Sequence, residues 1–468
     1  MEQYERKLKC ELYNDHMQNF KSYGIPKAQL IIGDMPYCYD EETECWTALG
    51  WKKYTELNYD DTVLSLNPAT MEIEYSGIEN IIVRDNTERM VRFETMHMNL
   101  LVTENHRMFV RHRYKSHSAG IRKRKFTSTD GIRLAKDVNG GWYIPRSGYT
   151  WKSASEQREI IIPSCELNTN GRESIADELH IPLDKWLPFF GLWLADGCTC
   201  NSKARNGRQL YTVSIKQAGE KRKIVREMLK DFPLKSIEYA EKNNDKSNFN
   251  IFSKQLWIYL HQFGKSKEKF VPRWILDLPT DYLRLLWKWY TFGDSHRNGD
   301  GLTISSVSEQ LMLDMQEVAL KLGTICQMRT ENYEYHSSPM WCFHFNPNSK
   351  DITYGSKQYV DGYKGKVWCI TCKTNSVFLV RRRGLIAWCG NCVGDDAYGS
   401  SPSWYLQGDN KCGESELAHS SFFDTDDYFR IPEFMDFCTR MLRPDPKMGG
   451  GETRQTGRRT LHDLVLCV

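Results

Sequence analysis

The chain has 468 residues, enough for about three domains, and its 63 Lys and Arg residues nearly balance its 60 Asp and Glu residues. A net charge of +3 excludes binding to nucleic acid through the overall electric field, so such binding would depend on local basic patches. No apolar run reaches the roughly 20 residues of a membrane span and no secretory signal begins the chain, so we expect a cytoplasmic protein. The cysteine count of fifteen is odd, which agrees with reduced or metal-bound thiols.

The first part of the sequence predicts short strands. A helix over residues 5–23 and a strand over 28–32 precede a Pro-containing loop that ends at Tyr37. Alternating patterns then predict strands over residues 44–47, 50–53, 62–66, 78–83 and 90–93. Turn residues separate these segments, so we expect an all-β domain. The basic runs at 111–115 and 122–125 are either a solvated loop or a patch that contacts phosphates.

The middle of the sequence, from about residue 170 to 345, has a mixed α/β pattern. Apolar residues at helical spacing predict one helix that ends at Asp196 and another that ends at Asp294, 98 residues later. Each aspartate is followed by a strand pattern and then by a helix pattern. These relations predict an internal duplication of an α-β-β-α unit. Strand patterns return over residues 367–371 and 376–380, so the α/β segment is expected to split the β domain.

Two distant stretches carry unusual chemistry. Cys38 follows the Pro-containing loop directly, and Asn391 is followed directly by Cys392. An asparagine amide can attack its own backbone carbonyl and cleave the chain after itself, while a cysteine thiol can capture an acyl group as a thioester. If residues 38–391 were removed, Tyr37 and Cys392 would join within one loop. The pattern therefore predicts self-splicing.

Residues 38–391, which are 354 of the 468, resemble an intein of the hedgehog/intein class that carries a LAGLIDADG homing endonuclease. The resemblance implies that the Cys38 thiol attacks the Tyr37 carbonyl. The Thr-x-x-His spacing of Thr103 and His106 matches the family pattern, with His106 protonating the departing amide nitrogen and Thr103 orienting it. A histidine after a strand is otherwise more often a structural residue.

The resemblance also assigns the C-terminal junction. It implies that Cys392 attacks the thioester and that Asn391 then cyclises and releases the insert. The family usually has His where this chain has Gly390 and Ser376, and Cys369 stands where the family has Asp or Cys, as an acid/base or orienting group. We expect Gly390 to let the backbone bend tightly into the attack geometry.

Residues 189–197 resemble the LAGLIDADG motif, and residues 287–295 resemble a degenerate second copy in which Trp289 replaces the small residue. The resemblance implies that Asp196 and Asp294 together hold Mg²⁺ or another divalent cation. It further implies double-stranded DNA as partner and a monomeric endonuclease with two internal repeats. Alternatively, each aspartate merely ends a packed helix. Lys269 resembles the lysine of a Lys-x-x-Pro element near the phosphate, or is an exposed lysine.

The flanking residues, joined, number 114 and resemble part of an amino DNA methyltransferase. Asp34, Pro36 and Tyr37 match its base-binding loop, in which the aromatic ring stacks on a flipped base. The resemblance implies S-adenosylmethionine as cofactor of a complete host. No Gly-rich cofactor site is apparent, so we expect a truncated host, either bacterial or phage-encoded.

The expected architecture is therefore multidomain. Residues 1–37 and 392–468 would be flanks of an α/β methyltransferase, 38–165 and 346–391 the two parts of an all-β splicing domain, and 166–345 the duplicated α/β endonuclease domain. Two alternatives stay open. One is a DNA endonuclease that no longer splices, and the other is a zinc site formed by Cys369, Cys372, Cys389 and Cys392, whose spacing suits four zinc ligands.

Overall fold

The computed structural model describes residues 38–391, apart from 87–88, 117–124, 170–171, 205–206, 208, 242–244 and 332–338. The expected helix over 5–23, the strand over 28–32 and both methyltransferase flanks lie outside the described residues. No helix within the described ranges has the length and apolarity that crossing a membrane requires.

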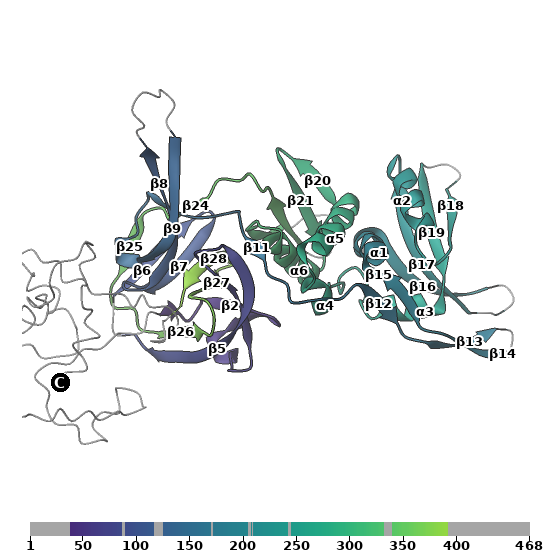
Figure 1. Cartoon of the computed structure of the whole chain (residues 1–468), viewed down its shortest axis with the longest axis horizontal. Helices are drawn as coiled ribbons and strands as arrows, with labels where there is room; N and C mark the ends of the chain where they lie inside the picture. The colour runs from purple at the N-terminus through teal and green to yellow at the C-terminus, as the bar shows by residue number, and fades with distance from the viewer. Residues whose placement is uncertain are drawn as a thin grey trace, which may run out of the picture. The chain divides into compact units, whose positions relative to one another are not determined.

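The two ends of the described segment form one β domain. Its twelve-stranded sheet joins strands up to residue 151 with strands from residue 357 onward, so early and late colours lie side by side in Figure 1. The members are β1 (Tyr39–Asp40), β2 (Glu44–Thr47), β3 (Gly50–Lys53), β4 (Thr62–Leu66), β5 (Glu72–Asp85), β6 (Met90–Thr95), β7 (Met98–Thr103), β11 (Thr150–Trp151), β25 (Lys357–Val360), β26 (Lys366–Cys372), β27 (Val377–Arg382) and β28 (Leu385–Gly390). The strands predicted from residue 44 onward in this domain are confirmed, and β5 is longer than expected.

A smaller sheet completes the β domain. Its order is β24–β10–β8–β9, with bounds β24 (Ile352–Thr353), β10 (Trp142–Ile144), β8 (Arg107–Ser116) and β9 (Lys125–Leu134). Two short 3₁₀ turns, η2 (Tyr54–Glu56) and η3 (Ala135–Asp137), connect the strands. Inward-facing residues from the first and the last part of the described segment share one hydrophobic core, because alternation places every second side chain of a strand on the same face.

The middle segment has two similar halves. The first contains α1 (Leu183–Asp196), β16 (Gly197–Lys203), β17 (Gln209–Ala218), α2 (Lys221–Lys230), β18 (Ser236–Ala240) and β19 (Lys246–Phe252). The second contains α5 (Thr280–Gly293), β20 (Ser295–Asn298), β21 (Gly301–Ser306), α6 (Glu309–Lys321), β22 (Met328–Glu331) and β23 (Met340–Phe345). Their sheets have matching orders, β16–β17–β19–β18 and β20–β21–β23–β22. The predicted duplication is confirmed, although each unit has four strands where two were expected.

Shorter elements connect the halves to the rest of the chain. These are β12 (Glu159–Ile162) paired with β15 (Leu179–Pro182), β13 (Cys165–Thr169) paired with β14 (Arg172–Ala176), α3 (Lys254–His261) and α4 (Arg273–Leu276). Helices α1 and α5 begin after Pro182 and Pro279, and each has an aspartate in its first turn, where the helix dipole favours negative charge. They lie next to each other between the two sheets (Figure 1) and bury their apolar stripes in a second core.

Candidate functional sites

Cys38 lies in a fixed position between two strands. Its backbone N–H donates to Thr103 Oγ1 at 3.1 Å, and its carbonyl accepts from the Thr103 N–H at 3.0 Å. Tyr39 pairs with Val102 on β7 and with Trp368 on β26, so one further step along each strand places Cys38 opposite Thr103 and Cys369. Directly opposed residues share a face of a sheet. The structure thus brings three of the predicted residues together, all of them buried.

His106 is buried one turn after Thr103. Its backbone N–H donates to the Thr103 carbonyl at 2.9 Å, and its own carbonyl accepts from Ala135 at 2.8 Å. The imidazole lies edge-on to the ring of Tyr39, with 4.3 Å between the ring centroids. The turn therefore brings His106 against the residue that follows Cys38.

Asn391 is held by hydrogen bonds from both its backbone and its side chain. Its N–H donates to the Ser376 carbonyl at 2.9 Å, and its Nδ2 donates to the Asn375 carbonyl at 3.1 Å. Asn375 is in turn fixed because its Nδ2 donates to Ser65 Oγ at 2.9 Å. The Asn391 Oδ1 is buried and has no hydrogen-bond partner among the described residues. Ser376 thus contributes its backbone carbonyl.

Gly390 is required by a close backbone approach. A Cβ at this position would lie 2.3 Å from the carbonyl oxygen of Arg107 and 2.7 Å from its Cβ, so no side chain fits. Gly390 belongs to the extended strand β28 and pairs with Val377, and its φ is not positive. The expectation that glycine provides a tight bend is therefore wrong. The Tyr39 hydroxyl donates to the Gly390 carbonyl at 2.5 Å, which links the two junctions.

The cysteines proposed as zinc ligands point to separate surroundings. Cys369 lies beside Cys38, the thiol of Cys372 lies against the Asn391 side chain, and Cys389 Sγ lies 3.8 Å from Met108 Sδ. Burial raises the pKa of Cys372 and of Cys389 to about 12, so both are protonated thiols at neutral pH. Within the described ranges there is no group of three potential metal ligands, and Cys392 lies outside them. The geometry does not support zinc.

The second site forms where α1 and α5 end. A Cβ on Gly191 would lie 2.8 Å from the Leu286 carbonyl oxygen and 3.3 Å from Trp289 Cβ, so a small residue faces the large Trp289. A Cβ on Gly293 would lie 2.7 Å from Asp196 Oδ2. The carboxylate of Asp196 therefore covers the end of α5, directly beside Asp294.

The two carboxylates are electrostatically coupled. Burial, with the charge of Asp196 as the next contribution, raises the pKa of Asp294 to about 6. Burial also raises the pKa of Asp196. The hydrogen bond of 2.5 Å that its Oδ2 accepts from Gln217 Nε2 lowers this pKa and offsets part of the increase. Two desolvated carboxylates that repel each other are hard oxygen ligands that suit Mg²⁺, with solvent or phosphate oxygens completing the coordination. The residues present therefore fit a divalent cation.

Two lysines fix the ends of these helices. Lys269 Nζ donates to the carbonyls of Trp193 at 2.8 Å, Leu194 at 2.9 Å and Gly197 at 2.8 Å, and thereby caps α1. Burial lowers the pKa of Lys269 to about 8. The alternative that Lys269 is exposed is wrong, since only 5% of it is accessible.

Lys221 has the corresponding position at α5. Its Nζ donates to the carbonyl of Phe292 at 2.5 Å and to that of Gly293 at 3.3 Å, and its charge lowers the pKa of both aspartates. Sequence reasoning missed Lys221 and Gln217. The partners of Lys221 are backbone carbonyls 71 and 72 residues away, which leave no pattern in the sequence.

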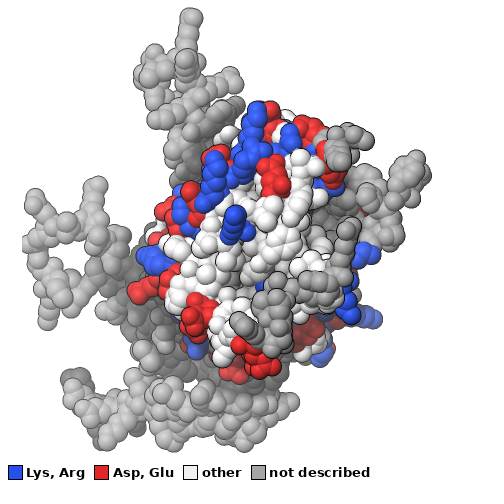
Figure 2. Space-filling model, turned by 90° about the vertical axis from the view of Figure 1, so that its right-hand side faces the viewer, with Lys and Arg blue, Asp and Glu red and all other residues white. Residues whose placement is uncertain are grey.

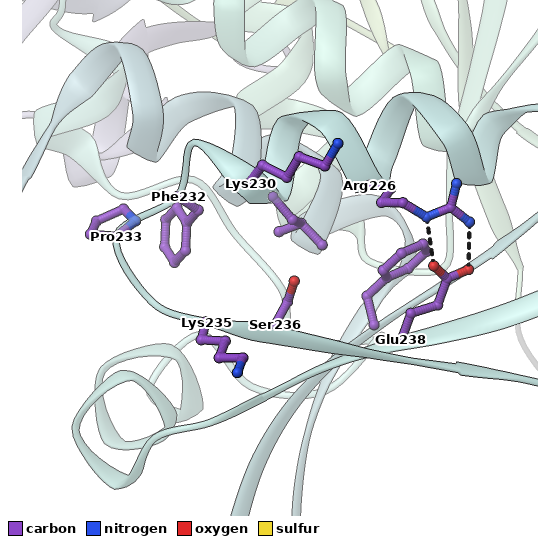
Figure 3. A pocket seen from close by; sticks show the side chains of 9 residues that line it. Arg226, Lys230, Phe232, Pro233, Lys235, Ser236 and Glu238 are labelled. Carbon is purple, nitrogen blue, oxygen red and sulfur yellow. Dashed lines mark hydrogen bonds and ion pairs between the residues drawn. The ribbon is translucent and has the colours of Figure 1, made fainter.

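The outer surface of the first half contains a separate hollow of about 530 Å³ between α2 and β18 (Figure 3). None of the predicted site residues lines it. Its Arg226 is engaged with Glu238 through two hydrogen bonds of 2.7 and 3.0 Å. Figure 2 shows charges of both signs on the face of this half, with Lys and Arg gathered toward its top.

No protein-family model matches the chain. Two curated proteins are similar to it. The proteolytic subunit of an ATP-dependent Clp protease of Chlamydomonas moewusii is 26% identical over 64% of this chain and 29% of its own length. The C-terminal section of an RNA polymerase beta subunit of Stigeoclonium helveticum is 24% identical over 95% of this chain and 44% of its own length. The chain thus spans less than half of either relative.

Similar solved structures include homing-endonuclease and intein domains. I-DmoI in complex with DNA and Mn is 15% identical, with a TM-score of 0.28 over 35% of this chain and 89% of that one. A bacterial intein-like domain from Clostridium thermocellum is 15% identical, with a TM-score of 0.18 over 32% and 79%. The AceL NrdHF class 3 split intein is 13% identical, with a TM-score of 0.17 over 46% and 98%. These likenesses assign no role to any residue.

Proposed function

We propose that residues 38–391 excise themselves from the chain and join the flanking residues, and that the middle segment cleaves double-stranded DNA. One observation carries the splicing proposal. Tyr39, which follows Cys38, donates a hydrogen bond to Gly390, which precedes Asn391. Cys38 and Asn391, 353 positions apart in sequence, therefore belong to one buried site. A segment that leaves and joins its flanks must bring its own ends together.

The first step forms a thioester at Cys38. Its sulfur bonds to the Tyr37 carbonyl carbon, the bond from that carbon to the Cys38 nitrogen breaks, and the thiol proton is transferred so that the nitrogen leaves as an amine. Thr103 orients this nitrogen through the 3.1 Å hydrogen bond, and His106 supplies the proton. Cys369, on the same face of the neighbouring strand, would assist as an acid/base or orienting group.

The later steps exchange and release the ends. The Cys392 thiol takes the acyl group from Cys38, which produces a branched chain. Asn391 Nδ2 then bonds to its own backbone carbonyl carbon, and the bond from that carbon to the Cys392 nitrogen breaks. A final shift of the acyl group from sulfur to nitrogen restores an amide between Tyr37 and Cys392.

For the DNA endonuclease, Asp196 and Asp294 would hold Mg²⁺ or another divalent cation, which when bound polarises the scissile phosphate and activates water. Gln217 holds the carboxylate of Asp196 in place, and Lys221 holds the end of α5. Lys269 fixes the end of α1 and contributes positive charge near the phosphate. The two repeats supply one aspartate each, so a monomer is sufficient.

The flanks are proposed to form part of a cytoplasmic, bacterial or phage-encoded methyltransferase host. Asp34, Pro36 and Tyr37 would bind the base, and a complete host would use S-adenosylmethionine. With the proposed boundaries, 38–165 and 346–391 splice, 166–345 cleave DNA, and 1–37 and 392–468 belong to the host.

The full-length Asn391→Ala variant tests the splicing proposal. It should form the thioester at Cys38 without cyclisation, so hydroxylamine should release a fragment of residues 1–37. The matched double variant with Cys38→Ala should release nothing. Equal resistance of both variants to hydroxylamine would contradict the proposed first step.

A further inference from the structure

Tyr39 is held by its surroundings in a single orientation. It is completely buried, and its ring centroid lies 4.3 Å from that of His106, 5.4 Å from that of Trp368 and 5.5 Å from that of Phe378. The neighbours come from three separate parts of the chain. A ring confined on these sides holds its hydroxyl in one position. There the hydroxyl donates a hydrogen bond of 2.5 Å to the Gly390 carbonyl oxygen.

The residue at position 390 cannot itself assist Asn391. Its α-carbon lies against the Arg107 backbone, where a Cβ would be only 2.3 Å from the carbonyl oxygen. Any polar group acting on this side of Asn391 must therefore come from another element. Tyr39 supplies one, because its hydroxyl reaches the carbonyl that precedes Asn391 in the chain.

Cyclisation requires the backbone of Asn391 to stay still while its side chain approaches the carbonyl carbon. One bond forms, from Nδ2 to that carbon, and one breaks, to the Cys392 nitrogen, while Nδ2 loses a proton and the departing nitrogen gains one. Besides the pairing of Gly390 with Val377, the backbone is held by the Tyr39 hydroxyl on the Gly390 carbonyl and by the Asn391 N–H on the Ser376 carbonyl, while Nδ2 must leave the Asn375 carbonyl before it attacks. Of these contacts, only that of Tyr39 comes from the N-terminal junction.

We propose that Tyr39 is the positioning residue for cleavage after Asn391, in the place where a penultimate histidine has no room. This inference rests on the proposed splicing function. Because Tyr39 is the immediate neighbour of Cys38, the same residue ties the geometry of the second cleavage to the strand that presents the first nucleophile. A correctly placed β1 is therefore a condition for release of the C-terminal end.

The full chain with Tyr39→Phe tests the proposal, since phenylalanine keeps the ring and removes only the hydroxyl. Loss of one buried hydrogen bond should slow cyclisation of Asn391 about tenfold, so that the branched intermediate accumulates. Release of residues 1–37 by hydroxylamine should proceed at the unmodified rate. Tyr54→Phe is a matched control, because the Tyr54 ring also stacks on Trp368 but belongs to η2.

The outcomes separate the two proposals. If the unmodified chain neither splices nor cleaves after Asn391, the proposed function fails and this inference with it. If the unmodified chain splices and Tyr39→Phe does so at the same rate, the inference alone is overturned. It is also overturned if Tyr39→Phe slows both junctions equally and lowers the melting temperature, since that pattern indicates a purely structural bond.

Discussion

The α-carbon of Gly390 lies against the backbone of Arg107 with no space for a side chain, since a Cβ there would be 2.3 Å from the Arg107 carbonyl oxygen. The partner is backbone, which cannot move aside without disturbing β8. The contact explains in physical terms why this junction has glycine at position 390.

Gly390→Ala should therefore destabilise the β domain by about 1–3 kcal/mol through overpacking. Gly390→His should also reduce cleavage after Asn391, because its side chain has no space beside the Arg107 backbone. Thermal unfolding measures the loss of stability in Gly390→Ala, and the rate of cleavage after Asn391 measures the effect of Gly390→His. Gly131→Ala in β9 is the control, because no atom lies within 4 Å of its added Cβ. Faster cleavage by the histidine variant would contradict the explanation.

Thr103→Val should slow thioester formation at Cys38 by about tenfold. Valine has nearly the same shape but cannot accept the hydrogen bond from the Cys38 N–H, so the amide loses its orienting partner. The rate of hydroxylamine-induced release of residues 1–37 measures this step. Cleavage after Asn391 serves as the internal control, and an unchanged first step would remove Thr103 from the mechanism.

Asp294→Asn should stabilise the protein while it abolishes DNA cleavage. Burial and Asp196 raise the pKa of Asp294 from 3.8 to about 6 in the folded chain, so the folded state binds this proton more tightly than the unfolded state. Folding stability therefore falls as pH rises from about 4 to about 6, and it stays reduced above that range. The variant should gain about 1–3 kcal/mol at pH 7–8 and nothing below about pH 4.

Urea unfolding over this pH range measures the gain, with Asp184→Asn at the start of α1 as the control. A gain that is independent of pH would show that the titration of Asp294 is not its cause. Added Mg²⁺ should stabilise the unmodified chain more than Asp294→Asn, because the cation relieves the repulsion between the two carboxylates.

Lys269→Met should cost about 2–4 kcal/mol, since it leaves three carbonyls at the end of α1 without their buried donor. Lys221→Met should cost less, because Lys221 has two such partners, one of them at 3.3 Å. Denaturant unfolding checks the order of the two effects. Lys223→Met, whose ammonium pairs with the exposed Glu220, is the control and should change little.

The elements with strong periodicity could be predicted from sequence. Strands β2, β3 and β4 have the expected bounds, and α1 and α5 end within two residues of the expected ends, because period and flanking Pro, Asp and Gly residues act locally. The duplication was visible since it repeats a local pattern. The additional strands of each half were not predicted. In β19 the burial alternates over Lys246–Phe252, but one inward position is the polar Ser247, which weakens the apolar pattern.

The contacts that complete the sites could not be predicted in this way. The Tyr39 hydroxyl and the Gly390 carbonyl are 351 residues apart, and the Lys221 partners are backbone atoms with no sequence signature. The sequence alone indicates that glycine at position 390 is unusual. The reason for the glycine is the backbone of Arg107, which is distant in sequence and leaves no space for a side chain. Such pairs depend on the register of strands and on helix packing, which only the folded chain determines.

We propose above all that this chain rearranges its own backbone. Expression of the unmodified chain under reducing conditions, followed by mass spectrometry of the intact products, tests it most directly. Splicing predicts two species. One has the mass of residues 38–391 and is 354 residues long, and the other is a joined species of 114 residues in which Tyr37 is bonded to Cys392. A single species of 468 residues that persists during incubation would contradict it.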